Sequence, residues 1–309
     1  MWGKDLVSLS GLERRDIDDL FALTQKVKAD PKAYRKALEG QTLGMIFHKP
    51  STRTRVSFEA GIWQLGGVGM YFSAGELQIG RGETIADTAR VLSRYLDGVM
   101  IRTFHHSDVE ELAANAEIPV INGLTDAAHP CQGLTDYFTM LEHCGDLTGL
   151  QVAYVGDGCT NVSHSLIQGA AILGVDLCIV CPEGYDPNPV VLAEAEAAAV
   201  ANGGRISVVR DPIEGVRGRR VIYTDVWTSM GQEEEAAKRR RDLVDYQVTM
   251  DLCRHGGEGW IFMHCLPAHR GEEVMDEVAD HPQSVIFDQA ENRLHVQKAA
   301  MIQLMGKKK

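Results

Sequence analysis

Short apolar runs alternate with amphipathic stretches along almost the whole chain, and this alternation is the sequence feature that most constrains the fold. Strands that alternate with helices form parallel sheets covered by helices on both faces. The sequence therefore predicts an α/β protein. The predicted strands are residues 43–47, 68–72, 98–101, 118–121, 151–155, 175–181, 205–209, 221–224, 260–264 and 284–287. The principal predicted helices are residues 57–65, 84–96, 110–116, 162–173 and 189–201.

The chain's 309 residues are enough for two domains of ordinary size. A helix-like stretch, residues 134–143, precedes the turn-forming segment 145–149 and separates two groups of alternating elements. A final helix candidate, residues 291–305, can fold back to the first group. We therefore expect one domain of residues 1–133 plus 291–309 and a second of residues 134–290, each a parallel β-sheet flanked by helices.

Composition excludes several classes of function. The formal net charge is −12, which disfavours a nucleic-acid partner but not a small anion held by local arginines. No stretch reaches the ~18 apolar residues of a membrane span, and the start lacks an export signal, so we expect no membrane partner and a cytoplasmic protein. The seven cysteines are then expected to be reduced. Cys178 and Cys181, within an apolar run, are expected to pack in the core rather than bind zinc.

The segment Ser51-Thr52-Arg53-Thr54-Arg55 directly follows a predicted strand and opens a predicted helix. A helix N-terminus offers unpaired backbone N–H groups and the positive end of the helix dipole. Hydroxyls and guanidiniums added there suit a phosphate group. The segment could equally be an ordinary helix cap with solvated arginines.

Two more polar motifs follow strands of the first half, at the sheet edge where α/β proteins bind ligands. Arg102 ends the strand 98–101, and an arginine in a buried strand is costly unless it is paired or binds an anion. His129 and Gln132 follow the strand 118–121 and could hydrogen-bond a carbonyl oxygen or an amide. A lone His-Pro pair is, by itself, usually a turn.

The second half places other chemistry after its strands. Gly156-Asp157-Gly158 follows the strand 151–155, but the full dinucleotide-binding spacing is absent. Asn161 lies at a helix start, where an N-cap is the simplest interpretation. Asp225 follows the strand 221–224 and precedes Ser229 in a glycine-containing loop. A carboxylate and a hydroxyl so placed suit a cationic amino group, although a helix-capping aspartate would have the same position.

Four motifs together carry a family resemblance. They are F-H-K-P-S-T-R-T-R-V-S-F-E at 47–59, H-P-C-Q at 129–132, D-V-W-T-S-M-G-Q-E at 225–233 and H-C-L-P at 264–267. The chain resembles the aspartate and ornithine carbamoyltransferases over nearly its whole length. Cys131 and the last two motifs resemble the ornithine branch. The resemblance implies transfer of the carbamoyl group of carbamoyl phosphate to the side-chain amine of ornithine, which gives citrulline and phosphate, a step of arginine metabolism.

The resemblance also implies a site. Its carbamoyl-phosphate contacts would be Ser51, Thr52, Arg53, Thr54, Gln78, Arg102, His129, Gln132, Cys265, Leu266 and Arg293. Its ornithine contacts would be Asn161, Asp225, Ser229 and Met230, and its catalytic residues Thr54, Arg102, His129 and Cys265. It implies neither metal nor cofactor. It further implies a homotrimer in which the loop bearing Gln78 serves the adjacent subunit.

One departure and several alternatives stay open at this stage. Thr160 stands where most members carry an asparagine. Putrescine lacks the carboxylate that Asn161 would bind, and N-acetyl- or N-succinylornithine lacks the cationic amine that Asp225 would bind, but transfer to any of them remains an alternative. Aspartate as acceptor is disfavoured by Cys131. Outside the class, a silent scaffold subunit is disfavoured by the complete set of contact residues, and a nicotinamide-dependent oxidoreductase by the missing glycine pattern.

Overall fold

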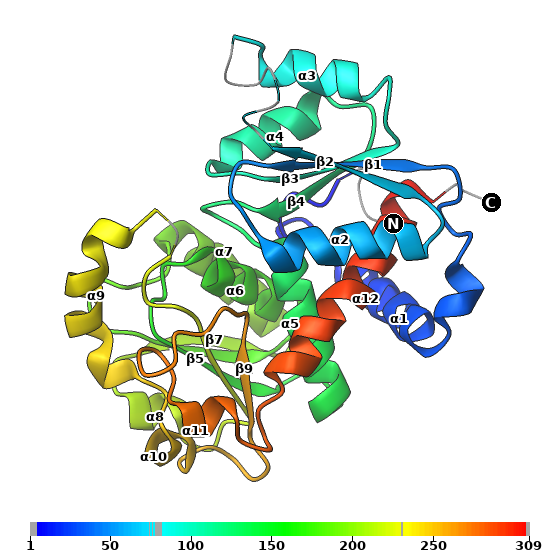
Figure 1. The fold of residues 1–309 in the computed structure, drawn as a ribbon. Coiled ribbons are helices and arrows are strands. Elements are labelled where there is room, and N and C mark those ends of the chain that lie inside the picture. Colours follow the sequence, from blue (N-terminus) through cyan, green and yellow to red (C-terminus); the bar gives the residue numbers. More distant parts are fainter. Residues whose placement is uncertain (1–4, 74, 76, 78–81, 230, 307–309) are drawn as a thin grey trace. The chain divides into compact units, whose positions relative to one another are not determined.

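The computed structural model describes residues 5–73, 75, 77, 82–229 and 231–306. The chain forms two compact units, unit 1 (Met1–Thr135 and Glu291–Lys309) and unit 2 (Asp136–Ala290) (Figure 1). Each unit contains a parallel sheet flanked by helices, so the predicted two-domain α/β fold is confirmed. The two unit boundaries fall within long helices, α5 (Pro130–Cys144) and α12 (Ile286–Met305).

Unit 1 has a four-stranded parallel sheet in the order β2-β1-β3-β4. Its strands are β1 (Thr42–Phe47), β2 (Val68–Ser73), β3 (Gly98–Arg102) and β4 (Val120–Leu124). The helices that lie wholly within unit 1 are α1 (Arg14–Ala29), α2 (Thr52–Gln64), α3 (Ile85–Leu92) and α4 (His106–Asn115), with the short η1 (Pro31–Tyr34).

The core of unit 1 fixes the sheet between its helices. Buried side chains of β1, β3 and β4 pack with those of α3 and α4, among them Ile46, Val99 and Leu112. Gly61 of α2 permits close packing on α12, because a Cβ there would lie 3.0 Å from Met301 Cε. α2 is thereby held with its N-terminus just after β1, which positions the hydroxyl-rich segment.

Unit 2 has a five-stranded parallel sheet in the order β7-β6-β5-β8-β9. Its strands are β5 (Gln151–Val155), β6 (Asp176–Val180), β7 (Arg205–Val209), β8 (Val221–Thr224) and β9 (Ile261–His264). Its helices are α6 (Asn161–Leu173), α7 (Pro189–Ala201), α8 (Pro212–Val216), α9 (Ala236–Leu243), α10 (Met250–Cys253) and α11 (Asp276–Ala279), with η3 (Glu233–Glu235) and η4 (Val244–Tyr246).

The core of unit 2 is nearly continuous. Strands β5, β6, β8 and β9 bury almost every side chain, as predicted for a sheet covered on both faces. Gly169 of α6 faces Tyr137 so closely that a Cβ would lie 2.3 Å from its ring. Cys178 and Cys181 are buried, each with its thiol intact, which confirms the expectation of core packing. Within the described residues, no helix is long and apolar enough to cross a membrane.

The strand order creates one reversal point in each sheet. In unit 1 the chain moves from β1 out to β2 and then returns to β3 on the other side of β1. In unit 2 it moves from β5 out to β7 and returns to β8 on the other side of β5. Open α/β sheets bind ligands at such points, beyond the carboxyl ends of the strands. The ends of β1 and β3, and of β5 and β8, are therefore the places to look for a site.

One predicted strand is wrong. The segment 284–287 makes only an isolated bridge, Phe262 with Ser284, and α12 begins at Ile286. The good helix formers that follow, such as Gln289 and Glu291, extend the last helix N-terminally past its predicted start at residue 291. A short apolar run cannot by itself distinguish a strand from the first turn of a buried helix.

Candidate active site

Ser51 shapes the polar end of β1 in unit 1. It is the N-cap of α2, and its side-chain oxygen accepts a hydrogen bond from the backbone N–H of Thr54 at 3.3 Å. The first backbone N–H groups of α2 thus lie just after β1, as the sequence predicts. Thr52 is exposed and Arg53 is partly buried at this helix start. Arg55 turns to the surface, where its guanidinium lies over the Tyr71 ring.

Arg293 of α12 contacts two other segments of unit 1, the start of α2 and the residues at the start of α5. One of its terminal nitrogens, Nη2, donates to Thr54 Oγ1 at 2.9 Å. The other, Nη1, donates to Gln132 Oε1 at 2.6 Å and lies 3.4 Å from His129 Nε2. All four side chains are at least nine-tenths buried. The structure therefore brings together four of the residues predicted to bind carbamoyl phosphate.

Arg102 ends β3 and is 5% exposed. Its register partner is Phe47, the last residue of β1, so Arg102 stands beside the segment that leads into α2. The pKa of His129 is held well below its ordinary value by burial and by the positive charges of Arg293 and Arg102. His129 is therefore a neutral imidazole near pH 7 in a cationic environment. Such a cluster suits an anion.

In unit 2, the buried charged side chain at a strand end is Asp225, directly after β8. Its side chain is 6% exposed, and Oδ1 accepts from the Cys265 thiol at 2.9 Å and from the Val226 N–H at 2.8 Å. Burial raises the pKa of Asp225, against the lowering effects of nearby His264 and of the Cys265 hydrogen bond. A buried carboxylate so placed is costly without a cation and therefore suits a ligand amine.

The segment after β9 is held by a buried histidine and carboxylate. His264 is fully buried, and its Nδ1 accepts from the Leu266 backbone N–H at 2.8 Å. Its Nε2 lies 3.2 Å from Glu273 Oε1, and Glu273 is also fully buried. Leu266 has a φ of 57°, a left-handed conformation that a residue with a side chain rarely adopts. The His264–Glu273 pair is thus built to hold the Leu266 backbone.

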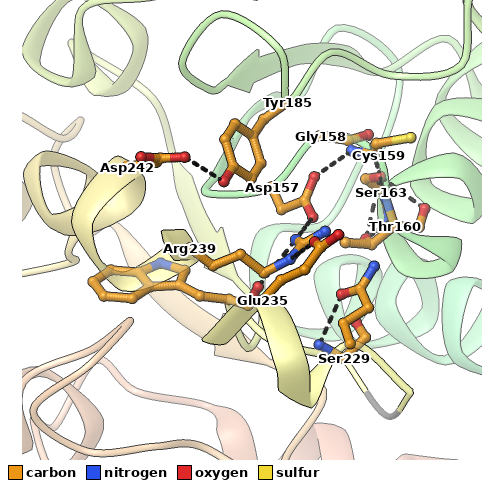
Figure 2. A network of polar contacts seen from close by, with 12 residues as sticks. Asp157, Gly158, Cys159, Thr160, Ser163, Tyr185, Ser229, Glu235, Arg239 and Asp242 are labelled. Atoms are coloured by element: carbon orange, nitrogen blue, oxygen red, sulfur yellow. Dashed lines mark hydrogen bonds and ion pairs between the residues drawn. The ribbon is translucent and has the colours of Figure 1, made fainter. Parts of the chain in front are cut away.

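The turn after β5 leads into α6. Thr160 is the N-cap of α6 and forms a capping box with Ser163, while Asn161 is the first residue of the helix. The simplest interpretation of Asn161, an N-cap, is therefore wrong, because Thr160 occupies that position. Ser229 lies in the loop after β8, where its N–H donates to Gln232 Oε1 at 3.1 Å (Figure 2).

Two predicted contacts cannot be placed. Gln78 and Met230 lie outside the described residues. Conversely, two largely buried side chains with defined partners in the structure could not be predicted from the sequence. Glu273 is one and Arg239, which bonds Asp157, is the other. Each lies several residues beyond a quoted motif, and an E-E or R-R-R run gives no signal that one member is buried.

Among the described residues of unit 2, two groups have metal-binding side chains close together. The ligand atoms of Asp225, His264 and Cys265 lie within 4.8 Å of one another, as do those of His269, Glu272 and Glu273. In the first group, Cys265 bonds Asp225 and both ring nitrogens of His264 have partners. The second group consists of neighbours in one turn. Its Glu273 accepts from the His269 backbone N–H, and its Glu272 pairs with Arg240. The expectation that no metal is needed stays a prediction.

Two family models match the chain in tandem. Residues 4–142 match the model described as the aspartate/ornithine carbamoyltransferase carbamoyl-P binding domain. Residues 148–304 match the model described as the Asp/Orn binding domain of the same enzymes. The chain therefore belongs to the aspartate/ornithine carbamoyltransferase family.

Comparison with individual proteins narrows this to the ornithine branch. The chain is 54% identical over 306 residues to the ornithine carbamoyltransferase of Thermococcus kodakarensis, which covers 98% of this chain and 97% of that one. It is 51% identical to the anabolic ornithine carbamoyltransferase of Pyrococcus furiosus, with 98% and 97% coverage. The resemblance to the ornithine branch is confirmed.

Solved structures agree. The ornithine carbamoyltransferase from Pyrococcus furiosus superimposes with a TM-score of 0.95 at 51% identity and covers 99% of this chain and 98% of that chain. The enzyme from Thermus thermophilus superimposes with a TM-score of 0.89 at 39% identity, covering 99% and 100%. The chain therefore shares the fold of these enzymes and aligns with nearly all of their length.

Proposed function

We propose that the chain transfers the carbamoyl group of carbamoyl phosphate to the side-chain amine of L-ornithine, giving L-citrulline and phosphate. The observation that carries this proposal is the pairing of opposite charges in the two units. Unit 1 gathers Arg102 and Arg293 around a neutral His129, whereas unit 2 buries Asp225 at a strand end. A phosphorylated donor and a diamino acid acceptor are ligands of these two kinds.

Carbamoyl phosphate is assigned to the cluster in unit 1. Its phosphate is bound by Ser51, Thr52, Arg53 and the backbone N–H groups at the start of α2, together with Arg102. Its carbonyl oxygen accepts from Thr54, Arg102 and His129. Its amide donates to Gln132 and to the Leu266 carbonyl. Cys265, Gln78 and Arg293 complete the set that the family resemblance implies, and Arg293 already orients Thr54 and Gln132.

Ornithine is assigned to unit 2. The carboxylate of Asp225 and the hydroxyl of Ser229 bind its α-ammonium group. Asn161, at the first position of α6, binds its α-carboxylate together with the backbone at Met230. The helix dipole of α6 adds to this, because Asn161 stands at the positive end of a long helix.

The reaction places two demands on these groups. The side-chain amine has an ordinary pKa near ~10.4, so it must be deprotonated before it attacks, and desolvation favours that form. As the amine adds to the carbonyl carbon, negative charge grows on the carbonyl oxygen. Donors already fixed in place stabilise it at no further cost of reorganisation. The tetrahedral intermediate then collapses, the carbon–oxygen bond to phosphate breaks, and phosphate leaves.

The proposal includes a homotrimer in the cytoplasm. The homotrimer has one feature in its support. Unit 1 exposes apolar side chains on α2 and β2, including Val56 at 57%, Trp63 at 76% and Val68 at 60%. They line a surface groove with Glu59, Ala60, Gly67 and Gly69. Exposed apolar patches of this kind mark association surfaces. Mass measurement of the purified protein tests the assembly, and Trp63→Glu is expected to weaken it.

A substrate panel tests the activity. Initial rates of carbamoyl transfer are compared for ornithine, putrescine, N-acetylornithine and N-succinylornithine at saturating carbamoyl phosphate. We expect ornithine to be preferred by about 100-fold in kcat/KM, because the acylated ornithines lack the charged amine that Asp225 bonds and putrescine lacks the carboxylate that Asn161 bonds. Equal rates with putrescine would contradict the assignment of Asn161, and a preference for an acylated ornithine would contradict that of Asp225.

A further inference from the structure

We propose that Arg239 is a positioning residue that sets the affinity for ornithine, because its buried guanidinium ties together the two segments assigned to the α-groups of that substrate. The inference rests on the proposed function. It concerns a side chain on α9, outside every motif that the sequence analysis selected. Figure 2 shows the network around it.

Arg239 makes its bonds with little exposure to water. Its side chain is 11% exposed, and that of Asp157 is 3% exposed. Arg239 Nη1 donates to Asp157 Oδ2 at 2.6 Å and to the Trp227 carbonyl oxygen at 3.2 Å. Its Nε donates to Glu235 Oε2 at 3.0 Å. One terminal nitrogen therefore bridges the turn after β5 and the loop after β8.

The carboxylate of Asp157 also orders the turn after β5. Asp157 Oδ1 accepts from the Cys159 N–H at 2.8 Å, which shapes the turn immediately before the Thr160 cap of α6. Asn161 follows as the first residue of that helix. Asp157 thus uses one oxygen to order the segment that presents Asn161 and the other to hold Arg239.

Arg239 holds the loop after β8 through the carbonyl group of Trp227. Trp227, whose carbonyl accepts from Arg239, is two residues before Ser229 and two after Asp225. The backbone N–H of Ser229 bonds Gln232, which belongs to the same loop. Arg239 therefore supplies a link from this loop to the rest of unit 2. Loss of that link lets Ser229 move relative to Asp225 and Asn161.

The attachment of α9 makes Arg239 hard to replace. Leu243 is the buried residue of this helix, and its other side chains are mostly exposed. Near the C-terminal end of α9, Asp242 accepts a hydrogen bond from the Tyr185 hydroxyl at 2.9 Å. The buried Arg239–Asp157 pair is thus a main attachment of the first turns of α9. Removing one member of a buried pair leaves the other charge uncompensated, which is the costly way to break it.

The chain offers a matched control pair. Arg210 Nη2 bonds Asp186 Oδ1 at the same 2.6 Å, but the side chains are 44% and 47% exposed. Exposed pairs of this kind contribute little. Asp186→Asn therefore removes an ion pair of equal length from the same unit without touching the ornithine-binding segments.

The test measures substrate binding and turnover separately. Arg239→Met, Arg239→Lys, Asp157→Asn and Asp186→Asn are prepared, and their folding is checked by circular dichroism and thermal unfolding. Binding of L-2-aminopentanoate is measured by calorimetry at saturating carbamoyl phosphate. This compound keeps the α-groups of ornithine and lacks its side-chain amine, so it binds without reacting. Initial rates then give the KM for ornithine and the KM for carbamoyl phosphate.

We expect Arg239→Met and Asp157→Asn to weaken aminopentanoate binding and raise the ornithine KM by about 10- to 100-fold, the range of a charged hydrogen bond. The carbamoyl-phosphate KM should stay within about twofold. Arg239→Lys, which keeps the charge, should be intermediate, and Asp186→Asn should match the wild type. A folded Arg239→Met protein that binds aminopentanoate normally, or that loses both substrates equally, would overturn the inference. Absence of citrulline from the wild type would instead overturn the proposed function.

Discussion

The polar clusters at the strand ends of the two units differ in charge and in construction. In unit 1, Arg293 and Arg102 surround His129; Thr54, Gln132 and Arg293 lie on helices, and Arg102 ends a strand. In unit 2, Asp225 is bonded by a thiol and a backbone N–H, and its neighbour Ser229 lies on a loop. The sign of the buried charge assigns the anionic donor to one unit and the cationic acceptor to the other.

The difference in construction has a kinetic consequence. Groups on regular elements are held within narrow limits, which suits the stabilisation of a developing charge. Groups on loops depend on supporting contacts such as that of Arg239 with Trp227. We therefore expect substitutions at Arg102 or His129 to lower turnover, and substitutions at Asp225, Ser229 or Arg239 to lower the use of ornithine.

The largest effect is expected for Arg102→Ala. This substitution removes a fixed donor for the developing negative charge, so kcat should fall by about 100- to 1000-fold. Citrulline formation is the measurement, with circular dichroism as the check on folding. Near-normal turnover in the folded variant would remove Arg102 from the site.

Asp225→Asn should act on the other substrate. It keeps an acceptor oxygen but removes the charge, so the ornithine KM should rise by about 10- to 100-fold while the carbamoyl-phosphate KM changes little. Since burial raises the pKa of Asp225, wild-type ornithine binding should weaken on acidification at a higher pH than an ordinary aspartate would give. If carbamoyl-phosphate affinity alone changed, the division of ligands between the units would be wrong.

Glu273→Gln sharpens the comparison by testing a supporting contact in unit 2. The substitution weakens the bond that holds His264 and, through it, the Leu266 N–H, so kcat/KM should fall by about tenfold, the effect of one good hydrogen bond. Glu272→Gln is the matched control, because the adjacent Glu272 is part exposed and pairs with Arg240. Equal activities for the two variants would show that the His264–Glu273 pair does not position Leu266.

The smallest expected effect is that of His129 on the pH dependence of folding stability. The folded-state pKa of His129 lies below the ~6.5 of an unfolded histidine, so below that pH the unfolded chain binds more protons. His129 therefore favours folding above about pH 6.5, and this contribution is lost progressively as the pH falls from there toward the depressed folded-state pKa. Denaturant unfolding of wild type and His129→Gln at pH 7.5 and 5.5 tests this. The wild type should lose more stability between the two pH values, and an equal loss would place His129 in a different environment.

Sequence reasoning worked best where a local pattern decides the outcome. The strand 151–155 and the helix Pro189–Ala201 have the predicted bounds, because a buried parallel strand and a Pro-initiated helix have strong local signals. The segment 284–287 failed, because an apolar run before good helix formers is ambiguous. The helix cap at Thr160 rather than Asn161 depends on one residue of register, which patterns do not fix.

The grouping of residues in the candidate site could be predicted only in part, for a related reason. Thr54, Gln132 and His129 were selected with Arg293, and the structure brings them together. Arg239 was not selected, since an arginine in a charged helix looks like a solvated one until the fold brings Asp157 to it across 82 residues of chain. Partners that meet only through tertiary structure leave no periodic signal in the sequence.

The central claim is that carbamoyl phosphate binds to unit 1 and the α-ammonium group of ornithine to unit 2. Its most direct test is a crystal structure with a bisubstrate compound in which a phosphonoacetyl group is joined to the side-chain amine of ornithine. We expect the phosphonate at the N-terminus of α2 with Arg102, and the α-ammonium group on the carboxylate of Asp225. A phosphonate bound elsewhere, or an α-ammonium group without contact to Asp225, would contradict it.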